Sequence, residues 1–219
     1  MIVTIDGPAA SGKGTAASGI AERLGFEYLD TGAMYRAVAL ATSRQGISWD
    51  DHAAVAAALP AIQIEMLPGR VLLNGEDVTV AIRAPEISQG ASKVGEIAAV
   101  RDFLIPQQRQ LAAGRDIVCE GRDQGTVVFP DAPVKFFITA DVRVRAERRY
   151  RELVARGLDT TLDREVAELK ERDRRDSQRP VGALKQPPDA VVIDTTHLGP
   201  DEVLDRLERE IRKWLPART

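Results

Sequence analysis

A glycine-rich turn between an apolar segment and a helical pattern constrains this chain more than any other feature. The apolar segment covers residues 2–5, and the helical pattern opens at Lys13. In such a turn the backbone N–H groups cradle phosphate oxygens, and the start of the helix adds positive dipole. The G-x-x-x-x-G-K spacing in this context predicts a phosphate-binding loop for a nucleoside triphosphate. We call residues 7–15 the phosphate loop, and its members are Gly7, Pro8, Ala9, Ala10, Ser11, Gly12, Lys13, Gly14 and Thr15.

The residue after Lys13 departs from the commonest form of this motif. Gly14 stands where most such loops carry the Ser or Thr that ligates magnesium, and Thr15 follows one place later. We therefore expect no direct metal ligand from the chain and a Mg²⁺ ion held mainly by phosphates and waters. Lys-Gly-Thr is also the variant found in nucleoside monophosphate kinases, which points away from GTPases and motor ATPases.

Composition limits the remaining classes of protein. The chain has 219 residues, 44% of them hydrophobic, and a net charge of −3, which gives no global case for nucleic-acid or membrane binding. No apolar run approaches the roughly 20 residues of a membrane span, and the first expected strand begins at Ile2, without a leader. Cys119, the single cysteine, excludes an internal disulfide and is expected to be buried in a strand. We expect a cytoplasmic protein.

Four further apolar runs predict buried strands, at residues 26–29, 116–119, 134–138 and 190–193. Helical patterns separate them, which is typical of a parallel α/β sheet with helices on both faces. Residues 62–79 differ, because short segments at 62–66 and 70–73 flank a Pro68-Gly69 turn, and Asn74-Gly75 precedes another short segment. This pattern predicts a small antiparallel insert, expected over the carboxyl edge of the sheet, where ligands bind in open α/β folds.

Charged residues gather where strands are expected to end. Thr31 and Arg36 follow the second strand, where Thr31 can cap a helix, and residues 120–125 follow the third strand. Loops at this edge commonly carry ligand contacts, although Thr31 as a mere cap and Arg36 as a surface residue remain alternatives.

The helical pattern at residues 162–177 changes character along one face. Its apolar stripe of Leu162, Val166 and Leu169 continues into charged positions at Arg172, Asp176 and Arg179. The face enters either solvent, as a row of weak surface ion pairs, or a polar site.

One reaction would need such arginines together. ATP and a nucleoside monophosphate repel each other, and several guanidiniums with a magnesium ion would neutralise that repulsion. An acceptor phosphate, with a second pKa near 6, needs no general base. Neither His52 nor His197 lies near a motif.

The motifs together resemble those of bacterial-type cytidylate kinases. The matching segments are Ile-Asp-Gly-Pro at 5–8, Gly-Lys-Gly-Thr at 12–15, Asp-Thr-Gly-Ala-Met-Tyr-Arg at 30–36, Gly-Arg-Asp-Gln-Gly-Thr-Val-Val-Phe-Pro-Asp-Ala at 121–132 and Lys-Glu-Arg-Asp-Arg-Arg-Asp-Ser-Gln-Arg at 170–179. The resemblance implies transfer of the ATP γ-phosphate to CMP or dCMP, with Mg²⁺. It implies catalytic roles for Lys13, Arg122, Arg172 and Arg179.

The same resemblance assigns the substrate contacts. Arg36, Arg122 and Arg179 would hold the CMP phosphate, Ser92, Arg101 and Asp123 would read cytosine, and Arg172 with Asp176 would contact the ribose. Thr31 stands where the family often has Ser. Glu120 stands where Asp is common, which weakens its link to magnesium-bound water.

The family fold is a five-stranded parallel sheet with an insert and a lid. It implies a core of residues 1–61, 94–149 and 164–219, a nucleotide-binding insert at 62–93 and a lid at 150–163. Gly157 would serve as a hinge, and Arg148 or Arg149 would reach toward ATP. The family also implies a monomer that binds small nucleotides.

Two other readings stay open. One is a phosphate-loop kinase for another acceptor, such as UMP or a small hydroxy metabolite. The other is an ATP-dependent nucleic-acid-binding module built on residues 143–179, although acidic residues there nearly balance the basic ones.

Overall fold

The computed structural model describes residues 1–215, and the chain divides into two compact units. The first unit combines Met1–Tyr28 with the chain from Gly114 onward, and the second is Leu29–Ala113. The phosphate loop and the predicted arginine-bearing helix both belong to the first unit.

Within residues 1–215, a five-stranded parallel sheet has the order β2-β6-β1-β7-β8. Its strands begin and end within two residues of the predicted ones, which confirms the predicted fold class. In register, Ile2 pairs with Ile117 and Val3 with Val134, so β1 lies between β6 and β7. The strands are β1 (Ile2–Asp6), β2 (Glu27–Asp30), β6 (Ile117–Gly121), β7 (Val134–Thr139) and β8 (Val191–Asp194).

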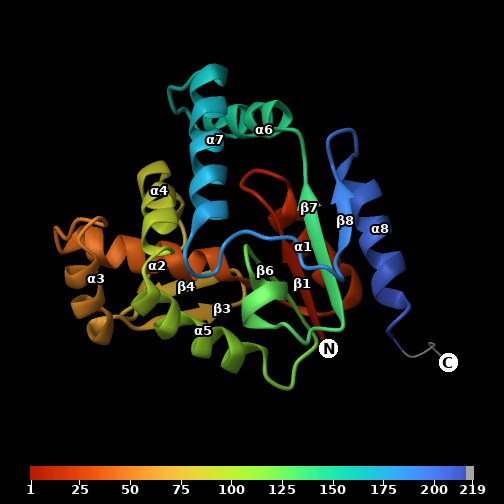
Figure 1. Cartoon of the computed structure of the whole chain (residues 1–219), viewed down its shortest axis with the longest axis horizontal. Coiled ribbons are helices and arrows are strands. Elements are labelled where there is room, and N and C mark those ends of the chain that lie inside the picture. Colours follow the sequence, from red (N-terminus) through yellow and green to blue (C-terminus); the bar gives the residue numbers. More distant parts are fainter. Residues whose placement is uncertain (216–219) are drawn as a thin grey trace. The chain divides into compact units, whose positions relative to one another are not determined.

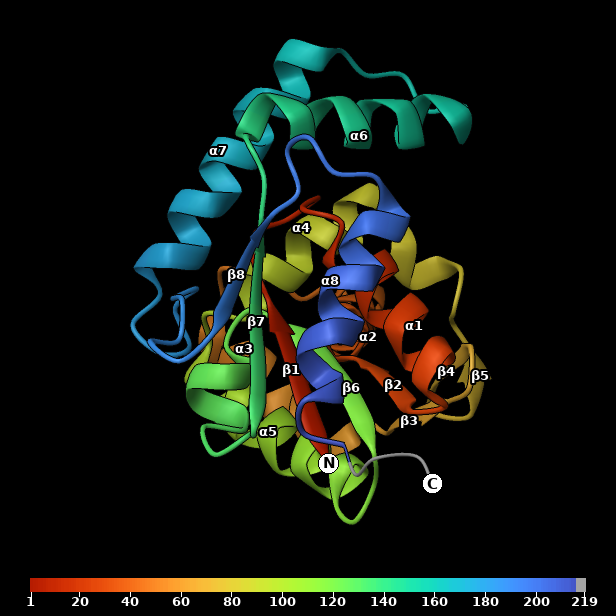
Figure 2. The ribbon, with the colours of Figure 1, turned by 90° about the vertical axis from the view of Figure 1, so that its right-hand side faces the viewer.

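Helices α1 (Lys13–Leu24) and α8 (Pro200–Arg212) pack side by side against one face of this sheet (Figures 1 and 2). Alternate strand residues such as Ile5, Val118 and Phe136 form the core there, because successive side chains of a strand point to opposite faces. Ile20 of α1 and Leu207 of α8 complete that core. The opposite face carries Thr4 and Lys135, and the short π-helical segment η3 (Gln124–Val128) approaches both residues at Gly125.

Helices α6 (Val142–Ala155) and α7 (Leu162–Gln178) lie against each other in the first unit (Figure 1). The predicted apolar stripe of α7 is confirmed, since Leu169 packs with Ala146 of α6 and with Ala9 of the phosphate loop. The two helices and the loop therefore share one small core.

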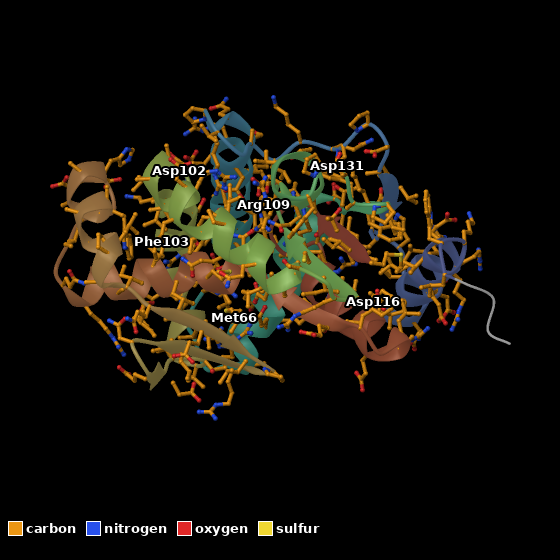
Figure 3. All side chains as sticks on the ribbon, turned by 90° about the horizontal axis from the view of Figure 1, so that it is seen from below. Met66, Asp102, Phe103, Arg109, Asp116 and Asp131 are labelled. Atoms are coloured by element: carbon orange, nitrogen blue, oxygen red, sulfur yellow. The ribbon has the colours of Figure 1, made fainter. Side chains whose placement is uncertain are left out.

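The amino ends of the strands mark the edge opposite the phosphate loop. Asp116, labelled in Figure 3, immediately precedes β6 and pairs with the amino group of Met1. Because the strands are parallel, the segments that follow β1, β6 and β7 emerge together at the carboxyl edge.

The second unit contains helices and a small antiparallel sheet. The sheet has the order β3-β4-β5 within the described residues, which confirms the predicted antiparallel character of residues 62–79. Trp49 packs directly on Gly90, where even a Cβ atom would come within 2.5 Å of the indole ring. The elements are α2 (Thr31–Arg44), α3 (His52–Ala58), η1 (Leu59–Ala61), β3 (Ile64–Leu67), β4 (Arg70–Leu73), β5 (Glu76–Asp77), η2 (Ala81–Arg83), α4 (Pro85–Val94) and α5 (Ala98–Ala112).

Candidate active site

The phosphate loop follows β1 and runs into α1, as the sequence predicts. Gly7, Ala10 and Gly12 all adopt positive φ angles, of 155°, 58° and 87°. Gly12 is the N-cap of α1 and offers no side chain to the free N–H groups of the first turn. Backbone N–H groups at such a helix start are free to bind an anion.

Gly7 is required by a close backbone approach. A Cβ atom at this position would lie 2.0 Å from the carbonyl oxygen of Ile138 in β7. At its start, the phosphate loop therefore lies directly against β7. This contact fixes the position of the first loop residue.

Lys13, within the phosphate loop, is buried beside a carboxylate. Its Nζ donates to the carbonyl of Pro8 at 3.2 Å and lies 3.3 Å from Oε1 of Glu120. Tyr28 donates to the other carboxylate oxygen of Glu120 at 3.0 Å. Burial and the nearby Arg122 lower the pKa of Lys13 to about 8, against the raising effect of Glu120. Lys13 is therefore still largely protonated at neutral pH.

Asp176 of α7 is the centre of the arginine cluster, which we define as Arg122, Arg172 and Arg179. The carboxylate accepts from Nε of Arg122 at 3.0 Å and from Nη2 of Arg179 at 2.5 Å, and Nε of Arg172 lies 3.9 Å away. Asp176 is only 1% exposed, so this is not a set of surface ion pairs. Burial opposes its ionisation, but the three guanidiniums hold the pKa of Asp176 far below its ordinary value.

The arginine cluster carries more positive charge than Asp176 can neutralise. Burial opposes the charge on Arg122, yet Asp176 and Glu120 raise its pKa, so the guanidinium stays ionised. Arg122 and Arg172 both act electrostatically on Lys13, so these two members of the cluster lie near the phosphate loop. Guanidiniums beside a phosphate loop suit the stabilisation of transferring phosphoryl groups.

Asp6, the last residue of β1, holds the segment that follows Arg122 and Asp123. Its buried carboxyl group accepts from the backbone N–H groups of Gln124 and Gly125, at 2.9 and 2.7 Å. Burial raises the pKa of Asp6 to about 7, against the lowering effect of these two hydrogen bonds. Asp123 immediately precedes the held segment and is 3% exposed.

Arg148 of α6 lies near the phosphate loop through Thr195, the residue after β8. Its Nη1 donates to Oγ1 of Thr195 at 3.0 Å, and Oγ1 donates in turn to the carbonyl of Ser11 at 3.0 Å. A Cβ on Gly12 would be 3.9 Å from Nη1 of Arg148. The structure thus brings Arg148 close to the loop.

Within the second unit, the predicted Thr31 cap is wrong. Asp30 is the N-cap of α2, and its Oδ1 accepts from the backbone N–H of Ala33 at 3.0 Å, whereas Thr31 is the first helical residue and is buried. A carboxylate is well suited to the N-cap position, because it accepts hydrogen bonds from the free N–H groups of the first turn and its negative charge is stabilised by the positive end of the helix dipole. Oδ2 of Asp30 also accepts from Nη2 of Arg36 at 2.6 Å, which holds Arg36 against the same turn.

The remaining predicted residues of the second unit are buried. Arg101 of α5 is 1% exposed, and its Nη1 donates to the hydroxyl of Tyr35 at 3.3 Å. Ser92 of α4 is 2% exposed. A buried arginine is unusual without a structural or binding role, since burying its charge is costly.

Three residues of the first unit that our reading of the sequence did not single out take part in this network: Asp6, Arg145 and Thr195. Arg145 of α6 donates to the carbonyl of Ala9 at 3.0 Å and pairs with Asp173 of α7 at 2.6 Å. Asp6 could have been found from its place at the end of a strand directly before Gly7. The sequence pattern offers no comparable signal for Arg145 or Thr195, because they bind backbone atoms of distant segments.

No group of three or more His, Cys, Asp or Glu residues within 1–215 could hold a metal ion. In the same part of the chain, no helix combines the length and apolar character needed to cross a membrane.

The parallel sheet, the phosphate loop and the cationic cluster define the class of P-loop kinases. Two solved structures share the fold. A shikimate kinase from Bacteroides thetaiotaomicron has a TM-score of 0.51 at 10% identity, over 97% of this chain and 98% of that one. A gluconokinase from Sinorhizobium meliloti 1021 has a TM-score of 0.52 at 14% identity, over 97% and 91%. Likenesses at these identities concern the fold alone.

The sequence is more specific about the family. The cytidylate kinase family model matches residues 3–213. A cytidylate kinase from Chromobacterium violaceum is 47% identical over 94% of this chain and 93% of its own length, and one from Solibacter usitatus is 49% identical over 97% and 92%. The chain therefore belongs to the cytidylate kinase family, which confirms the predicted resemblance and makes it a nucleoside monophosphate kinase with ATP as co-substrate.

Proposed function

We propose that this chain transfers the γ-phosphate of ATP to CMP or dCMP and releases ADP with CDP or dCDP. The observation that carries the proposal is the arginine cluster around the buried Asp176, close enough to Lys13 to lower its pKa. Phosphoryl transfer requires positioning and charge stabilisation far more than covalent chemistry, and this arrangement supplies both.

On the donor side, the backbone of the phosphate loop would cradle the ATP phosphates. Lys13 would place its charge at the terminal phosphates, and Arg148 would reach the nucleotide from α6. Each of these groups lies in the first unit. The phosphate loop and Lys13 follow the carboxyl end of β1, where a ligand is expected in an open α/β sheet.

The residues present fit a Mg²⁺ ion held mostly by the nucleotide. No group of three or more acidic, histidine or cysteine side chains within residues 1–215 could hold a metal ion, and Mg²⁺ generally keeps several of its waters when it binds. Glu120 is the carboxylate beside the loop, and a Cβ on Gly14 would lie 3.3 Å from its Oε2. Glu120 would hold Mg²⁺ through its waters, and the ion would neutralise phosphate charge.

On the acceptor side, the proposed contacts are assigned residue by residue. Arg36, Arg122 and Arg179 would bind the CMP phosphate, and Arg172 with Asp176 would bind the ribose, with Thr31 nearby. Ser92, Arg101 and Asp123 would read the base. A carboxylate accepts from the exocyclic amine of cytosine, and a guanidinium donates to the carbonyl oxygen and ring nitrogen.

The reaction needs no general base in this scheme. The acceptor phosphate is mostly ionised at neutral pH, so its oxygen attacks without losing a proton. We propose further that residues 62–93 form the nucleotide-binding insert and residues 150–163 form the lid, with Gly157 as its hinge. Closure would exclude water and limit wasteful ATP hydrolysis.

We also propose that the chain acts as a cytoplasmic monomer in pyrimidine nucleotide metabolism and does not bind nucleic acid. Residues 143–179 hold nine acidic residues against twelve basic ones, so the positive excess that the segment could offer to a phosphate backbone is small.

A coupled assay of ADP production tests the function. CMP, dCMP, UMP, AMP and shikimate are offered as acceptors, with ATP and Mg²⁺. We expect rapid turnover with CMP and dCMP and far slower turnover with the other three. Turnover that is fastest with UMP or shikimate would overturn the acceptor assignment, and acceptor-independent ATPase activity stimulated by RNA would overturn the enzyme class.

A further inference from the structure

Helices α6 and α7 are joined by two partly buried ion pairs with different surroundings. Nε of Arg149 binds Oε2 of Glu165 at 2.9 Å, and Thr160 donates to the other carboxylate oxygen at 2.6 Å. Nη2 of Arg145 binds Oδ2 of Asp173 at 2.6 Å. Only the second pair, of these two, also contacts the phosphate loop.

Arg145 joins three separate segments with one guanidinium. Its Nε donates to the carbonyl of Ala140 after β7 at 2.9 Å, and Nη1 donates to the carbonyl of Ala9 at 3.0 Å and to Oδ1 of Asp173 at 3.2 Å. Arg145 is 5% exposed, and its hydrogen bonds to the carbonyls of Ala140 and Ala9 are buried, whereas the side chain of Asp173 is 27% exposed. The planar, rigid fork of Arg145 is suited to fixing several acceptors in one geometry.

The contact with Ala9 affects the orientation of the next peptide group. In a trans peptide the C=O and the following N–H point in opposite directions. Holding the carbonyl of Ala9 toward Arg145 therefore turns the N–H of Ala10 to the other side. Ala10 has a φ of 58°, a left-handed conformation that a non-glycine residue keeps only when its surroundings impose it.

The contact with Asp173 acts on the other side of the site. Asp173 lies directly after Arg172 in α7 and one turn before Asp176, and it helps raise the pKa of Arg122. A side chain that holds Asp173 therefore also sets where α7 presents the arginine cluster. The packing of Ala9, Ala146 and Leu169 surrounds the same joint with apolar contacts.

We propose that Arg145 is a positioning residue for phosphoryl transfer, which locks the phosphate loop to α7 by binding the carbonyl of Ala9 and the carboxylate of Asp173 together. Donor phosphates and the arginine cluster are thereby held in one fixed relation. The inference rests on the proposed function, since it assumes that the loop binds ATP and that the cluster acts on the transferred phosphate.

Three variants and a matched control test the proposal. Arg145→Lys keeps the charge but cannot reach three acceptors, and Asp173→Asn keeps the shape but removes the charge. Glu165→Gln makes the same carboxylate-to-amide change in the other α6–α7 pair. Steady-state kcat, KM for ATP and KM for CMP are measured for each variant and for the Arg145→Lys/Asp173→Asn double variant, alongside thermal unfolding.

We expect Arg145→Lys to lower kcat about tenfold and to raise KM for ATP by a similar factor, with KM for CMP within about threefold. Asp173→Asn should lower kcat about tenfold with smaller changes in either KM. Glu165→Gln should stay within about twofold of the wild type in all three constants. The double variant should have nearly the kcat of Arg145→Lys alone, because both changes break one joint.

Equal kinetic losses in Asp173→Asn and Glu165→Gln would overturn the proposal, since both pairs would then serve only helix packing. Losses that multiply in the double variant would also overturn it. If Arg145→Lys does not fold, the comparison of Asp173→Asn with Glu165→Gln decides. Binding of a fluorescent methylanthraniloyl-ATP tests whether Arg145 shapes the loop for ATP, and we expect weaker binding in Arg145→Lys than in Glu165→Gln. This measurement does not depend on the acceptor. A wild type that does not phosphorylate CMP would therefore contradict the proposed function and leave this test intact.

Discussion

Lys13 shows how one residue balances opposing physical demands. Its ammonium group is buried, which lowers the pKa to about 8, yet the neighbouring Glu120 helps keep it charged. A lysine held in this way is already desolvated and directed before substrate arrives, so little reorganisation is left for the reaction.

Replacing Lys13 with Ala should lower kcat by about 10²–10³-fold, the usual cost of losing one preorganised charge at developing negative charge. CMP affinity should stay within a few-fold, because Lys13 faces the donor phosphates in our proposal. Turnover is measured with the coupled assay, and CMP affinity by calorimetry without ATP. An equal loss of CMP affinity would show that the donor and acceptor groups are not separate.

Replacing Asp123 with Ala should lower the preference for CMP over UMP. A buried carboxylate that accepts from the cytosine amine would face a carbonyl oxygen in uracil, a mismatch worth about 1–3 kcal/mol. The ratio of kcat/KM for CMP to that for UMP should therefore fall about tenfold or more. An unchanged ratio, with both values lowered together, would remove Asp123 from base recognition.

At the scale of single residues, the sequence predicted the residues proposed to contact substrate better than the residues that hold them in place. Lys13, Arg122 and Asp176 could be predicted from motifs, and the structure shows them in one charged network. Asp6 could have been found from its place before Gly7, but its partners could not be predicted, because Gln124 lies more than a hundred residues away in the chain. Arg145 could not be assigned a role for the same reason, since it binds the backbone of Ala9. The helix cap was misplaced by one residue, since Asp30 and Thr31 are both good caps and only geometry separates them.

The phosphate loop is the element whose shape depends most on its neighbours. At Gly7 the chain passes so close to the carbonyl of Ile138 that no side chain fits, and the positive φ adds to the requirement for glycine. The loop can therefore keep its path only as long as β7 lies beside β1.

Gly7→Ala should lower the free energy of unfolding by about 3 kcal/mol or more, because the backbone must move to accept the methyl group. Gly25→Ala is a matched control, since Gly25 also has a positive φ, of 70°, but no atom lies within 4 Å of the added Cβ. We expect about 1 kcal/mol there. Urea unfolding measures both, and similar losses would mean that the clash at Gly7 relaxes freely.

Elements were predicted well where a periodic pattern was strong. Helix α7 runs from Leu162 to Gln178, against a prediction of 162–177, and its apolar stripe leads into the arginine cluster as one of the two predicted outcomes. Whether that charged end was solvated or part of a site could not be decided from periodicity. The structure shows that this end of α7 is part of a charged cluster, because Asp176 pairs with Arg122, which lies 54 residues away in the chain.

The whole molecule combines two compact units, and the proposed substrate residues are divided between them. The donor groups, Arg122 and Asp123 belong to the first unit, whereas Arg36, Ser92 and Arg101 belong to the second. The bounds of the lid, residues 150–163, and of the insert, residues 62–93, remain predictions, because both segments are defined by how they would move when nucleotides bind.

Asp6 should make global stability depend on pH. Its pKa is about 7 in the folded chain against 3.8 ordinarily, so the folded state binds the extra proton between these values. Stability from this group is therefore fully present below about pH 4 and is lost as pH rises through 7. Urea unfolding from pH 5 to 8 should show the wild type losing stability relative to Asp6→Asn, and a difference independent of pH would contradict this.

The reactivity of Cys119 can report how often the central strands of the parallel sheet separate. The thiol lies in β6 beside β1, is fully buried, and has its pKa raised to about 12 by burial and by Asp6. An alkylating reagent needs both access and a thiolate, and the folded sheet denies it both. Since the sequence holds no other cysteine, the rate at which such a reagent consumes thiol should follow transient separation of the central strands, with no engineered probe required.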